Sequence, residues 1–191
     1  ERLVQAADLA VVGVDDAASA AMARRRQMAG RPLERISAEA PVEAGVFAGV
    51  TARDRVLETR LVRVVDLKPR IVAELTGIGS LRGQHNAQNA AAAFAVCAAL
   101  GVADEAIAAG LSTYPGLPHR MEEVGRKGRV VFINDSKATN ADSTEKALTS
   151  FRDIYWILGG KPKEGGIEPL RRYFPNIARA YLIGAASDAF A

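Results

Sequence analysis

Residues 130–140 read VVFINDSKATN, an apolar run that leads directly into a loop in which every residue except Ala138 is polar. Val130 to Ile133 has the length and the abrupt boundaries of a buried strand. Ligand sites of α/β proteins lie at the carboxyl ends of such strands. The stretch therefore predicts an α/β fold with a ligand-facing loop over residues 134–140.

The chain after residue 117 alternates strands with helices. The predicted elements are a hairpin over residues 121–135 with its turn at Gly125–Gly128, a helix from Ser143 to Ser150, a buried strand over Ile154–Leu158, a helix over Ile167–Tyr173, a strand over Ala180–Ile183 and a helix after Gly184. This alternation predicts a doubly wound, Rossmann-like sheet.

Residues 1–117 predict a parallel sheet with a small antiparallel section. Leu9–Val14 is an apolar run that ends in two aspartates, as a buried parallel strand before an Asp-capped helix would, and the helix runs to about Met28. Three adjacent arginines, 24–26, point in different directions on that helix, which favours a solvated helix end over a phosphate site. The antiparallel strands expected next are GVFAGV, VLETRLVRVVDL and IVAELT, separated by Arg-Asp and Lys-Pro turn signals.

Two helices complete this part of the chain. An Ala-rich helix follows residues 83–86 and runs to Leu100, with Gly101 as its stop, and Asp104 is expected to cap a second helix to about Ser112. Residues 114–119 contain two prolines and one glycine, which marks a boundary. We therefore expect two domains, 1–117 and 118–191.

Composition excludes several classes of protein. The 191 residues are 49% hydrophobic and 25% charged, which is ordinary for a globular chain, and a net charge of +3 is too small to imply nucleic acid or a membrane surface. No apolar run reaches the roughly 18 residues of a membrane span. The single cysteine, Cys97, lies in an Ala-rich run and is expected to pack in the core. We expect a monomer in the cytoplasm, and the missing initiator Met indicates a partial sequence.

Two amide side chains stand three residues apart at the start of the Ala-rich helix. Asn86 and Asn89 would lie on one helix face beside exposed backbone N–H groups, where carboxamides can bind an adenine or ribose edge. The alternative is that one caps the helix and the other makes a buried hydrogen bond.

A cationic pair follows Pro118 at the predicted boundary. His119 and Arg120 are preorganised by the proline, and the planar guanidinium suits phosphate or ribose contacts. The alternative is a salt bridge from Arg120 to Glu122 or Glu123.

The loop after the strand at 130–133 is the densest polar signal. Asp135 suits nucleotide hydroxyls, Lys137 suits a transferring phosphate or carboxylate, and Thr139 can donate to a bound acid. The alternative is a polar turn that caps the next helix. LGGKPK, which ends in Lys163, repeats this arrangement after the next strand, so two loops would converge on an anion.

Several motifs are absent from the sequence. It contains no G-x-x-x-x-G-K-[ST] loop and no G-x-G-x-x-G after a strand, and its two histidines cannot form a His-rich metal site. We therefore expect no metal site within the chain and no standard triphosphate site.

Four stretches in order, GQHNAQNAAAA, GLPHRMEEV, FINDSKATNADSTEKAL and WILGGKPK, resemble the Mur ligase family over essentially the whole chain. The resemblance implies the later part of a central ATPase domain followed by the start of a Rossmann-like C-terminal domain. DSKATN is the most specific element, because members that add amino acids other than D-glutamate typically carry a Tyr-Ala-His-containing sequence there.

The resemblance also implies an activity. Mg-ATP phosphorylates the carboxylate of UDP-N-acetylmuramoyl-L-alanine, and the amine of D-glutamate attacks the acyl phosphate in peptidoglycan synthesis. By motif match, Asn86, Asn89, Arg120 and Asp135 resemble adenosine-side contacts, and His119 a residue near the phosphates. Lys137, Thr139 and Lys163 resemble the groups that bind D-glutamate, so Lys137 and His119 are the expected catalytic residues.

The same resemblance implies parts outside the chain. The uridine-nucleotide domain, triphosphate loop, Mg²⁺ ligands and a carbamylated lysine would precede Glu1, and further D-glutamate contacts would follow Ala191. The isolated chain is therefore expected to be inactive. Three alternatives stay open: another Mur or folylpolyglutamate-type ligase, a non-catalytic nucleotide-binding or dehydrogenase-like domain, and a structural interaction module.

Overall fold

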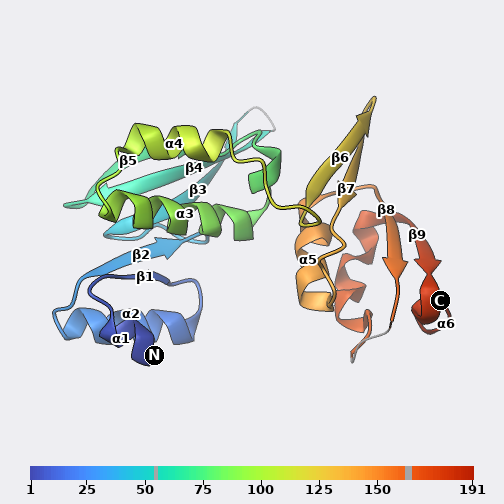
Figure 1. Cartoon of the computed structure of the whole chain (residues 1–191), viewed down its shortest axis with the longest axis horizontal. Coiled ribbons are helices and arrows are strands. Elements are labelled where there is room, and N and C mark those ends of the chain that lie inside the picture. Colours follow the sequence, from blue (N-terminus) through green and yellow to red (C-terminus); the bar gives the residue numbers. More distant parts are fainter. Residues whose placement is uncertain (54–55, 162–164) are drawn as a thin grey trace. The chain divides into compact units, whose positions relative to one another are not determined.

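A computed structural model describes residues 1–53, 56–161 and 165–191, with the backbone alone for 51–53, 56 and 57. The chain divides into two compact units, Glu1–Pro115 and Gly116–Ala191, which are drawn in blue to green and in yellow to red in Figure 1. Each unit combines helices with strands, so the chain is an α/β protein as predicted.

The first unit is built on one five-stranded sheet in the order β1-β2-β3-β4-β5. Its strands are β1 (Ala10–Gly13), β2 (Leu33–Ser37), β3 (Gly45–Arg53), β4 (Val56–Val65) and β5 (Lys68–Glu74). The pairs β1–β2 and β2–β3 are parallel, and β3–β4 and β4–β5 are antiparallel. The antiparallel section is therefore part of the parallel sheet. Its parallel member β2 was missed, because the sequence LERIS mixes charged and apolar residues.

The prediction of a Lys-Pro turn is wrong. Val65 pairs with Lys68, so the turn between β4 and β5 consists of Asp66 and Leu67, whose φ angles are 52° and 60°. Pro69 lies inside β5. A proline is tolerated there because β5 is an edge strand of this sheet.

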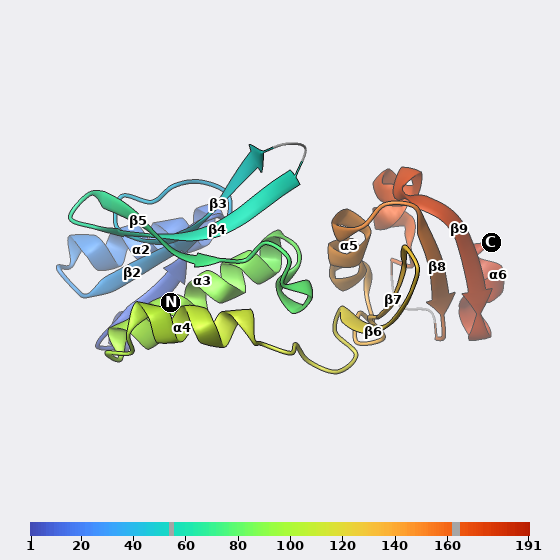
Figure 2. The same cartoon turned by 90° about the horizontal axis from the view of Figure 1, so that it is seen from above.

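Helices pack on both faces of this sheet (Figures 1 and 2). They are α2 (Ala17–Met28), α3 (Gln84–Ala99) and α4 (Asp104–Ser112). Ala10 and Val12 of β1 pack with Ala23 of α2, whereas the intervening Val11 packs in the larger cluster that contains Phe94 of α3. Successive strand residues point to opposite faces, so α2 and α3 cover opposite sides of the sheet.

Three residues were predicted from the sequence to begin or end these helices, and the prediction is confirmed for two of them and wrong for the third. The Asp16 carboxylate caps α2 by accepting the N–H groups of Ala18 and Ser19 at 3.0 and 2.9 Å. Gly101 follows α3 with a φ of 85°. Asp104 is not a cap, since Ala103 occupies that position and no side-chain cap is made.

The expectation of a solvated arginine cluster is wrong for Arg26, which is fully buried. Its guanidinium donates to the carbonyl oxygens of Val4, Ala7, Asp8 and Pro32. This network joins α2 to the short helix α1 (Arg2–Ala6) and to the residue that precedes β2 by one position. A buried charge is tolerated because its donors are satisfied.

The second unit contains two separate two-stranded sheets. Its elements are β6 (Glu122–Lys127), β7 (Val130–Asn134), α5 (Ala141–Ser150), β8 (Ile154–Gly159), η2 (Glu168–Asn176), β9 (Ile177–Ile183), η3 (Gly184–Ala186) and α6 (Ser187–Phe190). The hairpin β6–β7 is antiparallel and β8–β9 is parallel. The predicted element types are thus found, except that η2 is a 3₁₀ helix and that, among the described residues, the strands do not join into one doubly wound sheet.

Two details of the second unit differ from prediction. The hairpin turn is Gly128–Arg129, and Gly125 lies at an irregularity of the ladder. The strands are only partly buried, since Phe132 is 51% exposed and Ile157 is 68% exposed. Within the described residues, a sheet of two strands has too few neighbours to cover both of its faces.

Candidate functional site

The turn before β6 has an unusual backbone. His119 and Met121 have φ angles of 63° and 50°, a region that residues other than glycine seldom adopt. Such conformations persist only where surrounding interactions hold them. The hydrogen bonds of this turn therefore show which residues hold it in this conformation.

Those hydrogen bonds reach the loop that follows β7. The N–H of Lys137 donates to the carbonyl of His119 at 3.0 Å, and the N–H of Met121 donates to Asp135 Oδ1 at 3.0 Å. Asn134 Nδ2 lies 2.9 Å from His119 Nδ1. The turn at residues 119–121 and the loop at residues 134–137 thus form one cluster, which we call the paired loops.

Both acidic residues after this turn have partners other than Arg120. Glu122 Oε2 accepts the backbone N–H of His119 at 2.7 Å, and Glu123 pairs with Arg126 at 3.1 Å. The alternative of a salt bridge from Arg120 to either carboxylate is therefore not found.

The loop at 134–140 does cap a helix, but only through one residue. Asn140 Oδ1 accepts the N–H of Ser143 at 2.9 Å and caps α5. Across the described parts of the chain, the side chains of Arg120, Lys137 and Thr139 are exposed and make no hydrogen bond or ion pair. Two cations and a hydroxyl therefore lie on or next to the paired loops without a partner among the described residues, an arrangement suited to binding an anion.

Asn86 and Asn89 lie in the first turns of α3, in the other unit. Asn86 Nδ2 donates to the carbonyl of Arg82 at 2.9 Å, and Asn89 Nδ2 lies 3.4 Å from Asn86 Oδ1. Neither caps the helix, because Gly83, with a φ of 91°, occupies the N-cap position. The two carboxamides share one face, as the spacing predicted.

A carboxylate that the sequence analysis did not select holds the start of α3. Asp15 Oδ1 accepts the Ser37 hydroxyl at 2.5 Å, and its Oδ2 accepts the Ala38 N–H at 2.8 Å and Gln88 Nε2 at 2.6 Å. Asp15 follows β1 and Ser37 ends β2, so this network lies at the carboxyl ends of two parallel strands. The position of Asp15 after an apolar strand was the available signal.

The predicted second anion loop is only partly described. Lys163 lies outside the described residues. The presence of glycine at position 159 has a structural explanation, because a Cβ there would lie 1.8 Å from the carbonyl oxygen of Ile183 in β9. Gly160 also bonds to β9, since its N–H donates to the same oxygen at 3.0 Å. The two glycines thus allow strand pairing at this position.

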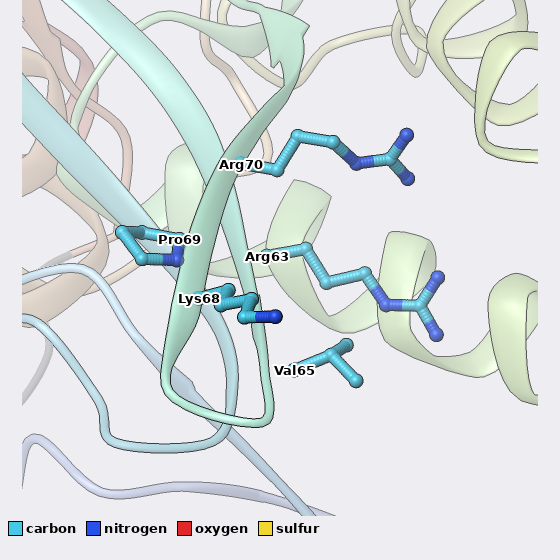
Figure 3. Close-up of a pocket in the computed structure, with 5 residues that line it drawn as sticks. All are labelled: Arg63, Val65, Lys68, Pro69 and Arg70. Carbon is cyan, nitrogen blue, oxygen red and sulfur yellow. The ribbon is translucent and has the colours of Figure 1, made fainter.

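A pocket of about 430 Å³ lies on the β4–β5 hairpin of the first unit and is lined by Arg63, Val65, Lys68, Pro69 and Arg70 (Figure 3). Arg63 and Arg70 extend to the same side of the hairpin, and both bind the carboxylate of Asp104 at the start of α4. The guanidinium groups therefore fasten the hairpin to α4, and the predicted site residues that the structure describes do not line this pocket.

The described ranges contain neither a cluster of metal ligands nor a membrane-spanning helix. No group of three or more His, Cys, Asp or Glu side chains there is placed to hold a metal ion. None of the helices described is both long enough and apolar enough to cross a membrane.

Comparisons with known proteins agree with the resemblance. Residues 119–191 match the family described as Mur ligase, glutamate ligase domain. The UDP-N-acetylmuramoylalanine–D-glutamate ligase of Mesorhizobium japonicum is 54% identical over 190 residues, and that of Rhizobium etli is 54% identical over 192. The whole chain is matched in both cases, but it spans only 39% of the length of each relative.

Solved structures with little sequence identity share the fold. UDP-N-acetylmuramate-alanine ligase MurC from Thermotoga maritima matches 95% of the chain, which covers 39% of that protein, with a TM-score of 0.64 and 14% identity. Folylpolyglutamate synthetase from Lactobacillus casei matches 92%, with 42% of that protein covered, a TM-score of 0.60 and 15% identity. Residues 119–191 therefore belong to the family of the Mur ligase, glutamate ligase domain, and the chain as a whole is similar to Mur ligases along its entire length.

Proposed function

We propose that this chain is a segment of a cytoplasmic, ATP-dependent ligase that joins D-glutamate to UDP-N-acetylmuramoyl-L-alanine in peptidoglycan synthesis. Support comes from relatives of that name that are 54% identical across the chain. In this proposal residues 1–117 belong to the central ATP-binding domain and residues 118–191 to the C-terminal domain. The observation that carries the proposal is the hydrogen bonding of the paired loops, which leaves Arg120 and Lys137 exposed without an acidic partner among the described residues.

Asn86, Asn89, Arg120 and Asp135 are proposed as adenosine-side contacts. The carboxamides of Asn86 and Asn89 present donors and acceptors on one helix face, which fits a purine or ribose edge. Arg120 has a planar fork of donors that fits ribose or phosphate oxygens. Asp135 braces the backbone of Met121, so its carboxylate position is fixed by the turn that also carries Arg120. ATP, when bound, supplies the phosphoryl group that activates the acceptor carboxylate.

Lys137, Thr139 and Lys163 are proposed to bind D-glutamate, and His119 to lie near the phosphates. The exposed ammonium of Lys137 and the hydroxyl of Thr139 can both donate to a carboxylate, and Lys137 can also stabilise charge that develops on the reacting acyl group. Among the described residues, no group of three or more His, Cys, Asp or Glu side chains is placed to hold Mg²⁺. Its ligands would lie elsewhere in the longer protein.

The decisive experiment places this chain in the context of a complete ligase. The matching segment of the Mesorhizobium japonicum enzyme is replaced by residues 1–191, since the alignment covers the whole chain. We expect the chimera to release ADP only when UDP-N-acetylmuramoyl-L-alanine and D-glutamate are both present. A preference for another amino acid would favour another Mur or folylpolyglutamate-type ligase, and nucleotide binding without turnover would favour a non-catalytic domain.

Lys137→Ala in this chimera tests the assignment within the site. We expect kcat to fall about 10²–10³-fold, the usual effect of removing one donor that stabilises transition-state charge. Lys127→Ala is the matched control, because Lys127 is also exposed but lies at the hairpin end of β6. Equal rates for the two variants would reject the role of Lys137.

A further inference from the structure

Asn134 lies within the paired loops but has no role in the function proposed above. Its Oδ1 accepts the backbone N–H of Ser136 at 3.2 Å. Its Nδ2 consequently faces His119 Nδ1 at 2.9 Å and Glu122 Oε2 at 3.5 Å. Two of these neighbours, the N–H of Ser136 and the carboxylate of Glu122, determine which way this amide points whatever the tautomer of His119.

The opposite orientation of the amide is unfavourable at both of these neighbours. A flipped side chain would place its NH₂ group against the N–H of Ser136, so that two donors would face each other. It would also place Oδ1 beside the carboxylate of Glu122, where two acceptors would repel. The amide N–H of Asn134 is therefore the donor toward the imidazole.

This orientation decides where the imidazole carries its proton. His119 Nδ1 can accept from Asn134 only if it is unprotonated, and a neutral imidazole then carries its proton on Nε2. We propose that Asn134 is a positioning residue that holds His119 as the neutral Nε2–H tautomer and orients the ring. The side chain of His119 is 61% exposed, so the Nε2 edge remains accessible to a ligand.

The backbone of His119 is fixed by the same group of residues. Its N–H donates to Glu122 Oε2 at 2.7 Å and its carbonyl accepts from Lys137 at 3.0 Å. The imidazole and its backbone are thus both held by the paired loops and Glu122. Such an arrangement presents a preorganised Nε2–H donor to an oxygen of an anionic ligand, a phosphate or an acyl phosphate, and this last step rests on the proposed function.

The tautomer can be read directly, because the chain contains only two histidines, His85 and His119. We would label the 191-residue chain with ¹⁵N and record long-range ¹H–¹⁵N correlations of the imidazoles at a pH above their titration. The expected result is an unprotonated Nδ1 and a protonated Nε2 for His119. A coupling across the hydrogen bond between Asn134 Nδ2 and His119 Nδ1 is also expected in the unmutated chain. A protonated Nδ1 in this chain would overturn the proposal.

Asn134→Asp tests the role of the amide. A carboxylate has the same shape and can still accept from Ser136, but it cannot donate to Nδ1, so the proton of His119 is expected to move to Nδ1. Asn140→Asp is the matched control, because Asn140 contacts the N–H of Ser143, and it should leave His119 unchanged. An unchanged His119 spectrum in Asn134→Asp would reject the proposal, and if that variant does not fold, the coupling in the unmutated chain decides.

The NMR spectrum and the ligase assay test the two proposals separately, so either proposal can be refuted without the other. A chimera without ligase activity would refute the proposed function but leave the tautomer assignment intact. An active chimera with a protonated Nδ1 in the isolated chain would refute the role of Asn134 alone. If both proposals hold, Asn134→Asp in the chimera should lower kcat without changing the KM for D-glutamate, because the residue orients a donor and does not contact the amino acid.

Discussion

Arg26 provides the most direct test of how the first unit is held together. Its side chain is fully buried, and its guanidinium donates to four backbone carbonyls, three of them in residues 4–8. Arg26→Met keeps an apolar stem of similar length but removes all of these donors. The expected result is detachment of residues 1–8 from α2 and destabilisation of the first unit.

The magnitude follows from the number of bonds. A net value of about 0.5–1.5 kcal/mol for each of the four bonds gives roughly 2–6 kcal/mol. Removal of a buried charge recovers part of this, because the guanidinium no longer has to be desolvated. We therefore expect the free energy of unfolding of the first unit to fall by about 3 kcal/mol.

Hydrogen exchange measured by mass spectrometry in increasing urea gives this free energy for each segment. Amides of β1 and α2 should lose protection in Arg26→Met, whereas the fluorescence transition of the single tryptophan, Trp156 in β8, reports the second unit and should not move. Arg25→Met is the matched control, because Arg25 is half-exposed and pairs with Glu1 at the surface. The effect of the control should stay below about 1 kcal/mol. Equal exchange in the two variants would refute the reasoning.

Three further predictions concern the second unit and the isolated chain. Asn140→Ala removes the cap of α5 and should cost about 1 kcal/mol in the unfolding transition reported by Trp156; no change would mean that the cap is dispensable. The hydrogen bond from the Tyr173 hydroxyl to Glu145 lowers the pKa of Glu145 below 4.5 and raises the pKa of Tyr173 above 10.0. The stabilisation of the fold by this bond should therefore be lost below pH 4.5, as Glu145 is protonated, and above pH 10.0, as Tyr173 ionises. Tyr173→Phe should flatten both changes in an unfolding series against pH, and an unaltered profile would contradict the assignment. The 191-residue chain alone should release no ADP with both substrates, and substrate-dependent release would refute the proposal that the phosphate-transfer machinery lies outside it.

The ends of helices could be predicted from the sequence because they depend on residues close together in the chain. Asp16 caps α2 through N–H groups two and three residues away, and Gly101 ends α3 by adopting a φ that other residues avoid. The polar loop at 134–140 and the shared helix face of Asn86 and Asn89 could also be predicted, because each depends on residues close together in the chain. These features do not require knowledge of the tertiary structure.

Long-range partners were decided by the tertiary structure alone. Arg26 resembled its exposed neighbours in the sequence, and only its contacts with residues up to 22 positions away make it a buried residue. Asp104 looked like a helix cap but binds Arg63 and Arg70 on the β4–β5 hairpin. A charged side chain takes the partners that folding brings to it, and local sequence does not encode them.

The candidate site divides in the same way. Sequence by itself determined the resemblance to the Mur ligase family and the two polar segments, because the motif GLPHR and the motif DSKATN are properties of consecutive residues. Only the tertiary structure decided that His119 and Asn134, fifteen positions apart, share a hydrogen bond. Hydrogen-bond direction depends on which donors and acceptors meet in space, so the proton position on His119 follows from the fold and not from either motif.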